Sequence, residues 1–157
     1  MMRGESAKRA SGMAFFVAAT VCFAALAIVR PAEIGSIQKG IDTCAACGMV
    51  IEDSGFAGAR VVVKDGRESI LYYDDLGCLL DAAREKDAVT ARRTFVQDSA
   101  DGEWVRGEDA WFVMDTRNRT PMGSGILAFR DKRSDGMRFD EIAKQRREYM
   151  RAKYGGE

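Results

Sequence analysis

The sequence contains no histidine, and this absence restricts its possible chemistry more than any other feature. None of the 157 residues carries an imidazole, so the chain cannot form a Ser-His-Asp triad or a Cys-His nucleophile. It also cannot form a His-rich catalytic zinc site, or a blue-copper site of two histidines and one cysteine. Any metal bound by this chain must therefore be held mainly by sulfur or oxygen.

An excess of charge of either sign is also missing. The 24 Lys and Arg residues balance 24 Asp and Glu residues, whereas nucleic-acid binding depends on a basic excess. No nucleic-acid partner is therefore expected. The chain has only 2 prolines, and its 46% hydrophobic and 31% charged residues are typical of a globular protein. Its length predicts one folded domain.

The N-terminal region is predicted to anchor the chain in a membrane. Residues 12–29 carry no charge, and this length is about the minimum for a spanning helix at roughly 1.5 Å per residue. Basic residues outnumber acidic ones in residues 1–11, which favours a cytoplasmic N-terminus and a periplasmic remainder in a single-pass inner-membrane protein. A cleaved signal peptide is the alternative, since Ala25-Leu26-Ala27 resembles a cleavage site. Cys22 is expected to face lipid.

Residues 30–43 are predicted to be a tether, and residues 44–157 the folded domain. In its first half we predict strands at 59–64 and 69–73, because Asp65-Gly66 between them is a strong hairpin signal. Asp74-Asp75 offers an N-cap for a helix, in which apolar residues recur at helical spacing. A third strand is expected at 91–97.

The second half repeats this order weakly. Strands are predicted at 110–115 and 125–130, separated by a loop, and an amphipathic helix is predicted from Phe139 onward. The fold class expected from both halves is α+β, with two small β-β-α-β-like half-units.

The motif Cys44-Ala45-Ala46-Cys47-Gly48-Met49 is the most informative feature. Two thiols three positions apart can reach one metal ion. Gly48 permits an unusual backbone angle, so that the chain can fold back and Met49 can add a thioether. Thiolates and thioethers are soft ligands that select Cu(I) among biological metals.

Two other interpretations of this motif stay open. Cys44 and Cys47 could form a disulfide in an exported protein, or they could form a redox-active pair. Thioredoxin-type pairs open a helix after a strand, whereas this motif follows a tether and precedes a strand. Both a metal site and a disulfide are compatible with the sequence.

Cys78 and Met122 are further candidates. Cys78 is predicted at the third position of a helix capped by Asp75, where the helix dipole should lower its pKa. It could be a ligand or a transfer relay, although a buried core cysteine is the interpretation we favour slightly. Met122 stands between Pro121 and Gly123 in a turn. Turns lie at the surface, so its thioether is a plausible soft ligand.

Together these motifs resemble the NosL family of copper chaperones that serve the assembly of nitrous oxide reductase. The resemblance covers residues 42–143. It rests on Asp42-x-Cys44-x-x-Cys47-Gly48-Met49, Tyr73-Asp74-Asp75-Leu76-Gly77-Cys78, Trp111-Phe112-Val113, Pro121-Met122-Gly123, Ala128-Phe129, Gly136 and Arg138-Phe139-Asp140-Glu141-Ile142.

The resemblance implies a fold of two β-β-α-β half-units, similar to that of organomercurial lyase, and a role as a carrier rather than an enzyme. It implies Cu(I) bound by Cys44 or Cys47 with Met122, and less directly by Met49. The implied partners are nitrous oxide reductase and its membrane ABC-type maturation complex.

The chain departs from the family pattern in two respects. Family members are typically lipoproteins, whereas this chain has a predicted helical anchor. Many also carry histidine near the second glycine motif and in a C-terminal tail, and this chain has none. The main hypothesis is a membrane-tethered periplasmic Cu(I) carrier. The alternative is an exported thiol–disulfide oxidoreductase that uses Cys44 and Cys47, with Cys78 as a resolving thiol.

Overall fold

The computed structural model describes residues 34–155, except for residues 53–54, 65 and 84–90. The predicted cytoplasmic tail at 1–11 and the predicted anchor at 12–29 lie outside this range. No helix within the described residues has the length and apolarity needed to cross a bilayer.

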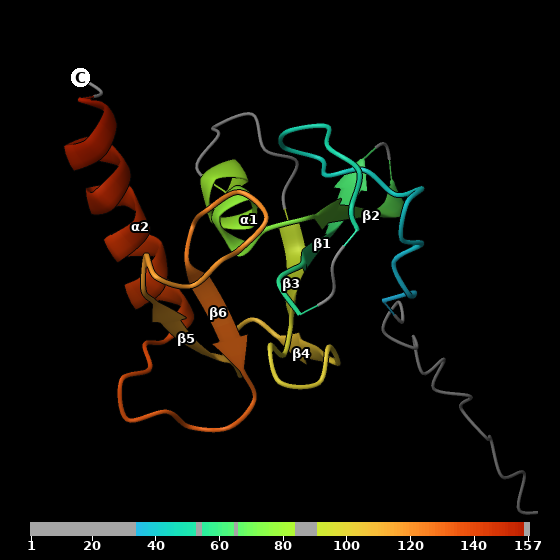
Figure 1. The fold of residues 1–157 in the computed structure, drawn as a ribbon. Helices are drawn as coiled ribbons and strands as arrows, with labels where there is room; N and C mark the ends of the chain where they lie inside the picture. Colours follow the sequence, from blue (N-terminus) through green and yellow to red (C-terminus); the bar gives the residue numbers. More distant parts are fainter. Residues whose placement is uncertain (1–33, 53–54, 65, 84–90, 156–157) are drawn as a thin grey trace, which may run out of the picture. The chain divides into compact units, whose positions relative to one another are not determined.

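Four antiparallel strands form the main sheet (Figure 1). They are β1 (Gly58–Lys64), β2 (Arg67–Tyr73), β3 (Ala91–Gln97) and β4 (Trp104–Arg106), in the order β2-β1-β3-β4. The first three confirm the strands predicted from the sequence. The short edge strand β4 was not predicted.

The hairpin between β1 and β2 has the expected tight turn. Lys64 pairs with Arg67, so two residues separate the strands. Gly66 has a φ of 74°, a conformation that glycine adopts without steric cost. This local signal therefore sets the register that brings Tyr73 opposite Gly58.

Helix α1 (Leu76–Ala82) follows β2 directly. Asp75 is its N-cap, and the carboxylate of Asp75 accepts a hydrogen bond from the Gly77 amide, as predicted. The helix contacts β1 and β2 on one side, and β6 and α2 on the other. It therefore lies at the junction of the two halves of the domain.

The second half consists of the hairpin β5 (Trp111–Met114) and β6 (Ile126–Phe129), followed by α2 (Phe139–Tyr154). Acidic residues in the first turn of α2 and basic residues in the last turn complement its dipole. The prediction of a second β-β-α-β-like unit was wrong in its last element. Because α2 continues to Tyr154, no strand follows it among the described residues.

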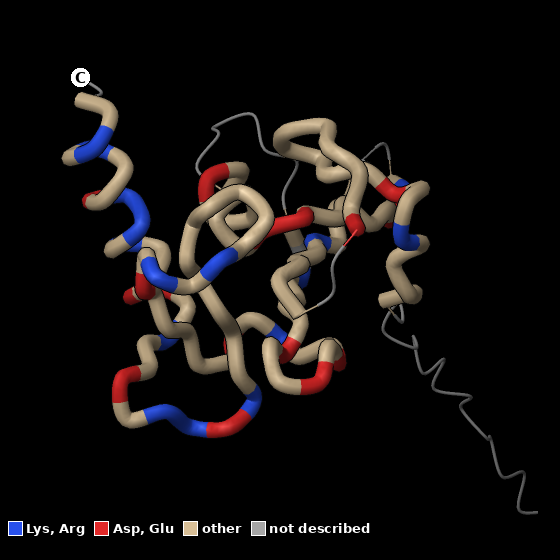
Figure 2. Tube along the Cα trace, in the orientation of Figure 1, with Lys and Arg blue, Asp and Glu red and all other residues tan. Residues whose placement is uncertain are grey.

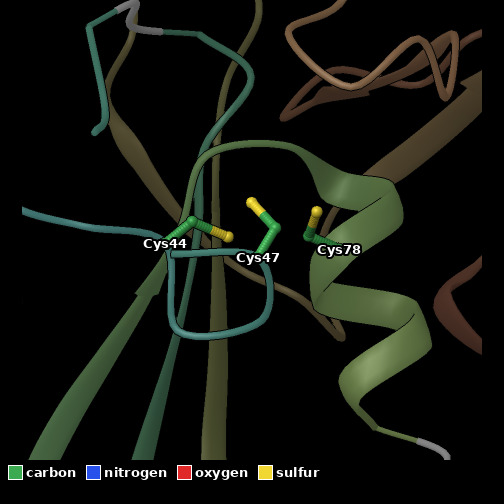
Figure 3. Close-up of side chains that lie close together, drawn as sticks. All are labelled: Cys44, Cys47 and Cys78. Atoms are coloured by element: carbon green, nitrogen blue, oxygen red, sulfur yellow. The ribbon is translucent and has the colours of Figure 1, made fainter. Parts of the chain in front are cut away.

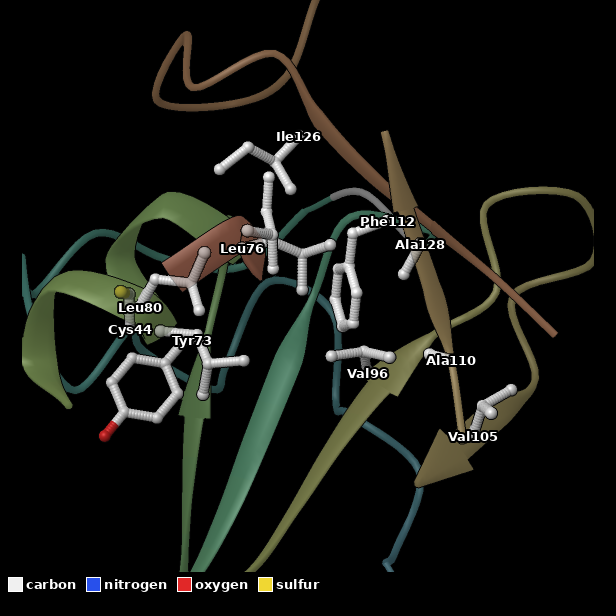
Figure 4. Close-up of a cluster of buried hydrophobic side chains, with 12 residues drawn as sticks. Cys44, Tyr73, Leu76, Leu80, Val96, Val105, Ala110, Phe112, Ile126 and Ala128 are labelled. Carbon is white, nitrogen blue, oxygen red and sulfur yellow. The ribbon is translucent and has the colours of Figure 1, made fainter. Parts of the chain in front are cut away.

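One hydrophobic core joins the two halves (Figure 4). Phe112 of β5 is fully buried. Its ring packs edge to face against the ring of Phe139, with the two ring centroids 5.8 Å apart. Leu76 and Leu79 of α1 are also buried. The buried cluster consists of Cys44, Tyr73, Leu76, Leu79, Leu80, Val96, Val105, Ala110, Phe112, Ile126, Ala128 and Ile142. Cys44 is thus part of the core as well as of the candidate site.

An ion pair fastens the two helices to each other. Figure 2 shows Lys and Arg residues recurring along α2, and one of them, Arg146, is only 9% exposed. Its guanidinium donates to the Asp81 carboxylate of α1 at 2.8 Å. Removing one partner of such a largely desolvated pair costs more folding stability than removing one partner of an exposed pair.

The substitution Asp81→Ala is expected to lower the free energy of unfolding by about 1–3 kcal/mol, because it leaves the Arg146 charge without this carboxylate. Urea denaturation followed by circular dichroism measures the change. Asp135→Ala is the matched control, since the Asp135–Arg133 pair is largely exposed and its loss should cost less than about 0.5 kcal/mol. Equal losses in both variants would contradict the prediction.

Candidate metal centre

The Cys44–Met49 segment folds back on itself, as the sequence predicts. The Cys44 amide donates to the Met49 carbonyl and the Gly48 amide donates to the Cys44 carbonyl, both at 2.8 Å. Thr43 and Val50 form a β-bridge at the open end. Gly48 has a φ of 75°, which a residue with a side chain would adopt only with strain.

This turn is attached to the end of β2. The Ala45 amide donates to the Tyr72 carbonyl at 2.8 Å. Only two residues, Asp74 and Asp75, separate β2 from α1. The attachment therefore brings the two thiols of the turn close to the first turn of α1, which carries Cys78.

Three thiols converge at this point (Figure 3). The sulfur atoms of Cys44, Cys47 and Cys78 all lie within 4.8 Å of one another. Cys44 is 2% exposed, Cys78 is half-buried and Cys47 is exposed. Small rotations of the side chains would let all three sulfurs reach a single ion.

The surroundings affect the three thiols differently. Burial raises the pKa of Cys44, but hydrogen bonds from the backbone amides of Asp74, Cys47 and Ala46 outweigh it, so that this pKa lies below its usual value. Burial raises the pKa of Cys47. Cys44 is therefore the thiol that ionises first.

The prediction that the pKa of Cys78 falls was wrong. Burial raises this pKa well above its usual value, and the negative charges of Cys44, Cys47 and Asp75 raise it further. The helix dipole does not compensate, because α1 has only seven residues and the Asp75 carboxylate already occupies its N-terminus. Cys78 would lose its proton only when a cation takes the proton's place.

The two predicted thioether ligands lie at the surface. Met49 is 51% exposed and Met122 is 44% exposed. A groove of about 490 Å³ separates the turn from the loop that carries Met122. It is lined by Gly48, Met49, Val50, Glu52, Asp74 and Pro121. The structure thus brings the three cysteines together, and it leaves both methionines partly exposed.

Sequence reasoning underestimated Cys78 and Asp75. Cys78 packs against the core, and its position in the first turn of a helix was the only available sign that its thiol could reach those of Cys44 and Cys47. Asp75 was predicted to cap the helix, but a contact with the loop of Met122 was not predicted. Its second oxygen, Oδ2, accepts hydrogen bonds from the Thr120 hydroxyl at 2.7 Å and from the Met122 amide at 2.9 Å. No local sequence signal connects positions this far apart.

The fold and the thiol cluster define a small α+β domain with a group of cysteines that could hold a metal ion. The family model of NosL matches residues 36–143, which is more than half of the chain, and the chain therefore belongs to the NosL family. NosL is a family of copper chaperones and not of enzymes. A search of curated proteins found no match.

The fold is similar to that in the crystal structure of the copper chaperone NosL from Shewanella denitrificans, with a TM-score of 0.57 and 20% sequence identity. The match covers 81% of this chain and 91% of the other. At this identity the likeness establishes the shared fold.

Proposed function

We propose that this protein is a copper chaperone that binds Cu(I) through the thiols of Cys44, Cys47 and Cys78, assisted by the thioether of Met122. The observation that carries the proposal is the convergence of three sulfur atoms within 4.8 Å in a member of the NosL family. Soft sulfur ligands favour Cu(I) over hard ions such as magnesium. Zinc would require a fourth ligand.

The graded burial of the thiols suits the transfer of a metal ion. Cys44 lies in the core, whereas Cys47 is exposed. An acceptor protein can therefore replace Cys47 first while Cys44 still holds the ion. Met49 and Met122, both exposed near the same groove, offer further soft ligands at the exit.

The client proposed for this copper is nitrous oxide reductase, reached through its membrane ABC-type maturation complex. Membership of the NosL family supports this proposal.

We further propose that residues 12–29 anchor the chain in the inner membrane and that the domain lies in the periplasm. The uncharged run and its basic flank support this location. A phosphatase fused after Glu157 should be active only if this orientation is correct.

An anaerobic titration of the reduced full chain, solubilised in detergent, tests copper binding directly. A chromogenic Cu(I) chelator competes with the protein for the metal. One equivalent should be withdrawn from the chelator with sub-micromolar affinity. Failure to compete at all would overturn the proposed function.

Copper affinity is expected to fall as the pH falls, because Cu(I) must displace the protons of Cys47 and Cys78, whose pKa values are raised. Between pH 8 and 6 the apparent association constant should drop by about one to two log units per pH unit, for one to two protons released per ion. The same titration repeated at several pH values measures the slope. A flat profile would show that these thiols do not coordinate the ion.

A further inference from the structure

Asp75 connects two segments that are far apart in the sequence. Its side chain is completely buried. One carboxylate oxygen, Oδ1, accepts a hydrogen bond from the Gly77 amide at 2.6 Å. The other, Oδ2, accepts hydrogen bonds from the Thr120 hydroxyl at 2.7 Å and from the Met122 amide at 2.9 Å.

The bonds to Oδ2 attach helix α1 to a loop that contains two glycines. Gly123 and Gly125 both have positive φ angles, so the loop backbone has access to many conformations when unconstrained. Thr120 relays the constraint, because its hydroxyl also contacts the Ser124 hydroxyl at 3.3 Å and accepts a hydrogen bond from the Gly125 amide at 3.2 Å. Hydrogen bonds to a charged carboxylate are stronger than those between neutral groups.

The same carboxylate also positions a thiol. By capping α1, Asp75 fixes the first turn of the helix, in which Cys78 stands three residues later. The Met122 side chain is 44% exposed, so packing holds it only in part and its location follows that of its backbone. Asp75 therefore helps to place both the helix turn that carries Cys78 and the backbone of Met122.

We infer that Asp75 is a positioning residue that holds the Met122 thioether in reach of copper at the thiol cluster. This inference rests on the proposed function. Asp75 does not bind the ion itself, because both of its oxygens are occupied by hydrogen bonds from the protein. It acts through the Met122 backbone, as residues behind a metal ligand commonly do.

The substitution Asp75→Asn separates the role of this side chain as a helix cap from its role in holding the Met122 loop. Asparagine is as good an N-cap as aspartate, so its side-chain oxygen can keep the bond from Gly77. Its amide nitrogen would then face the Met122 amide, and two donors repel each other. Cu(I) affinity should fall by about 10–100-fold, the usual effect of removing such a supporting residue.

A double-variant cycle shows whether the effect passes through Met122. Met122→Leu should lower the affinity by a similar factor, and Asp75→Asn should add almost nothing in the Met122→Leu background. If the fold-losses of the two single variants multiplied in the double variant, the two residues would act independently and the inference would be overturned. An unchanged affinity in Asp75→Asn alone would also overturn it. Asp101→Asn, an exposed aspartate between β3 and β4, is the matched control and should bind copper normally.

Hydrogen exchange on the copper-free protein separates this inference from the proposed function. The Met122 amide should be protected in the native protein and should lose protection in Asp75→Asn. If the Met122 amide were equally protected in Asp75→Asn, the inference would be overturned, but the proposed copper binding would not be affected. Absence of copper binding by the native protein would overturn the proposed function and the role of Asp75 in it. If Asp75→Asn does not fold, Thr120→Val removes the bond from the Thr120 hydroxyl to Asp75, together with its contacts to Ser124 and the Gly125 amide. It leaves the helix cap and the Met122 amide bond in place, and it should give a smaller loss of the same kind.

Discussion

Replacing Cys44 with serine is expected to weaken Cu(I) binding by roughly 10²–10³-fold. Four ligands together contribute about 10–16 kcal/mol in zinc-finger peptides, so that one ligand contributes about 2.5–4 kcal/mol. Cys44 should give the largest loss of the three cysteines, because its pKa is lowered and the amides around it stabilise its thiolate. The chelator competition measures the change.

Parallel serine variants of Cys47 and Cys78 determine the ligand number. A loss of the same order in Cys78→Ser would establish a site with three thiolates. A loss confined to Cys44 and Cys47 would leave a thiol pair completed by Met122. Cys22→Ser is the matched control, since Cys22 lies in the predicted anchor, and it should bind copper as the native chain does. Native affinity in Cys44→Ser would contradict the site.

Replacing Gly125 with alanine is expected to lower the free energy of unfolding by about 2–5 kcal/mol. Gly125 has a φ of 67°, and a Cβ there would lie 2.2 Å from the Asp115 carbonyl oxygen. The left-handed conformation costs a residue with a side chain about 1–2 kcal/mol, and the clash adds about 1–3 kcal/mol. The loop leading to Met122 can relieve the clash only by moving away from β5.

Gly123 provides the control for this prediction. Its φ is 65°, but a Cβ at this position would meet no atom within 4 Å. Gly123→Ala should therefore show only the conformational cost of about 1–2 kcal/mol. Urea denaturation of both variants gives the comparison. Equal losses would show that the close approach to Asp115 does not restrict the loop.

The elements that the sequence predicted well are those with local signals. The Asp-Gly turn, the Asp75 cap and the valine-rich strand each depend on residues within a few positions of one another, and β1, β2 and α1 form where these signals stand. The strand β4 was missed because its three residues are too few for alternation to be visible. It forms because Val105 pairs with Val96 of the neighbouring strand β3.

The second half shows how a pattern of elements can mislead. Strand, strand and helix recur in the expected order, which suggested a repeat of the first unit. The helix α2 instead continues for 16 residues and packs along β5 and α1. Apolar residues on one face of a helix are compatible with either outcome, because the sequence does not state which surface will cover them.

By itself the sequence determined the type of chemistry. The absence of histidine leaves sulfur and oxygen as the candidate ligands, and the Cys44-x-x-Cys47-Gly48-Met49 motif favours sulfur. Gly48 determines the turn that presents the two thiols. Only the tertiary structure brought Cys78 to this turn and joined Asp75 to the loop of Met122. These contacts depend on how β2, α1 and the hairpin pack together, and packing between distant segments leaves no periodic signal in the sequence.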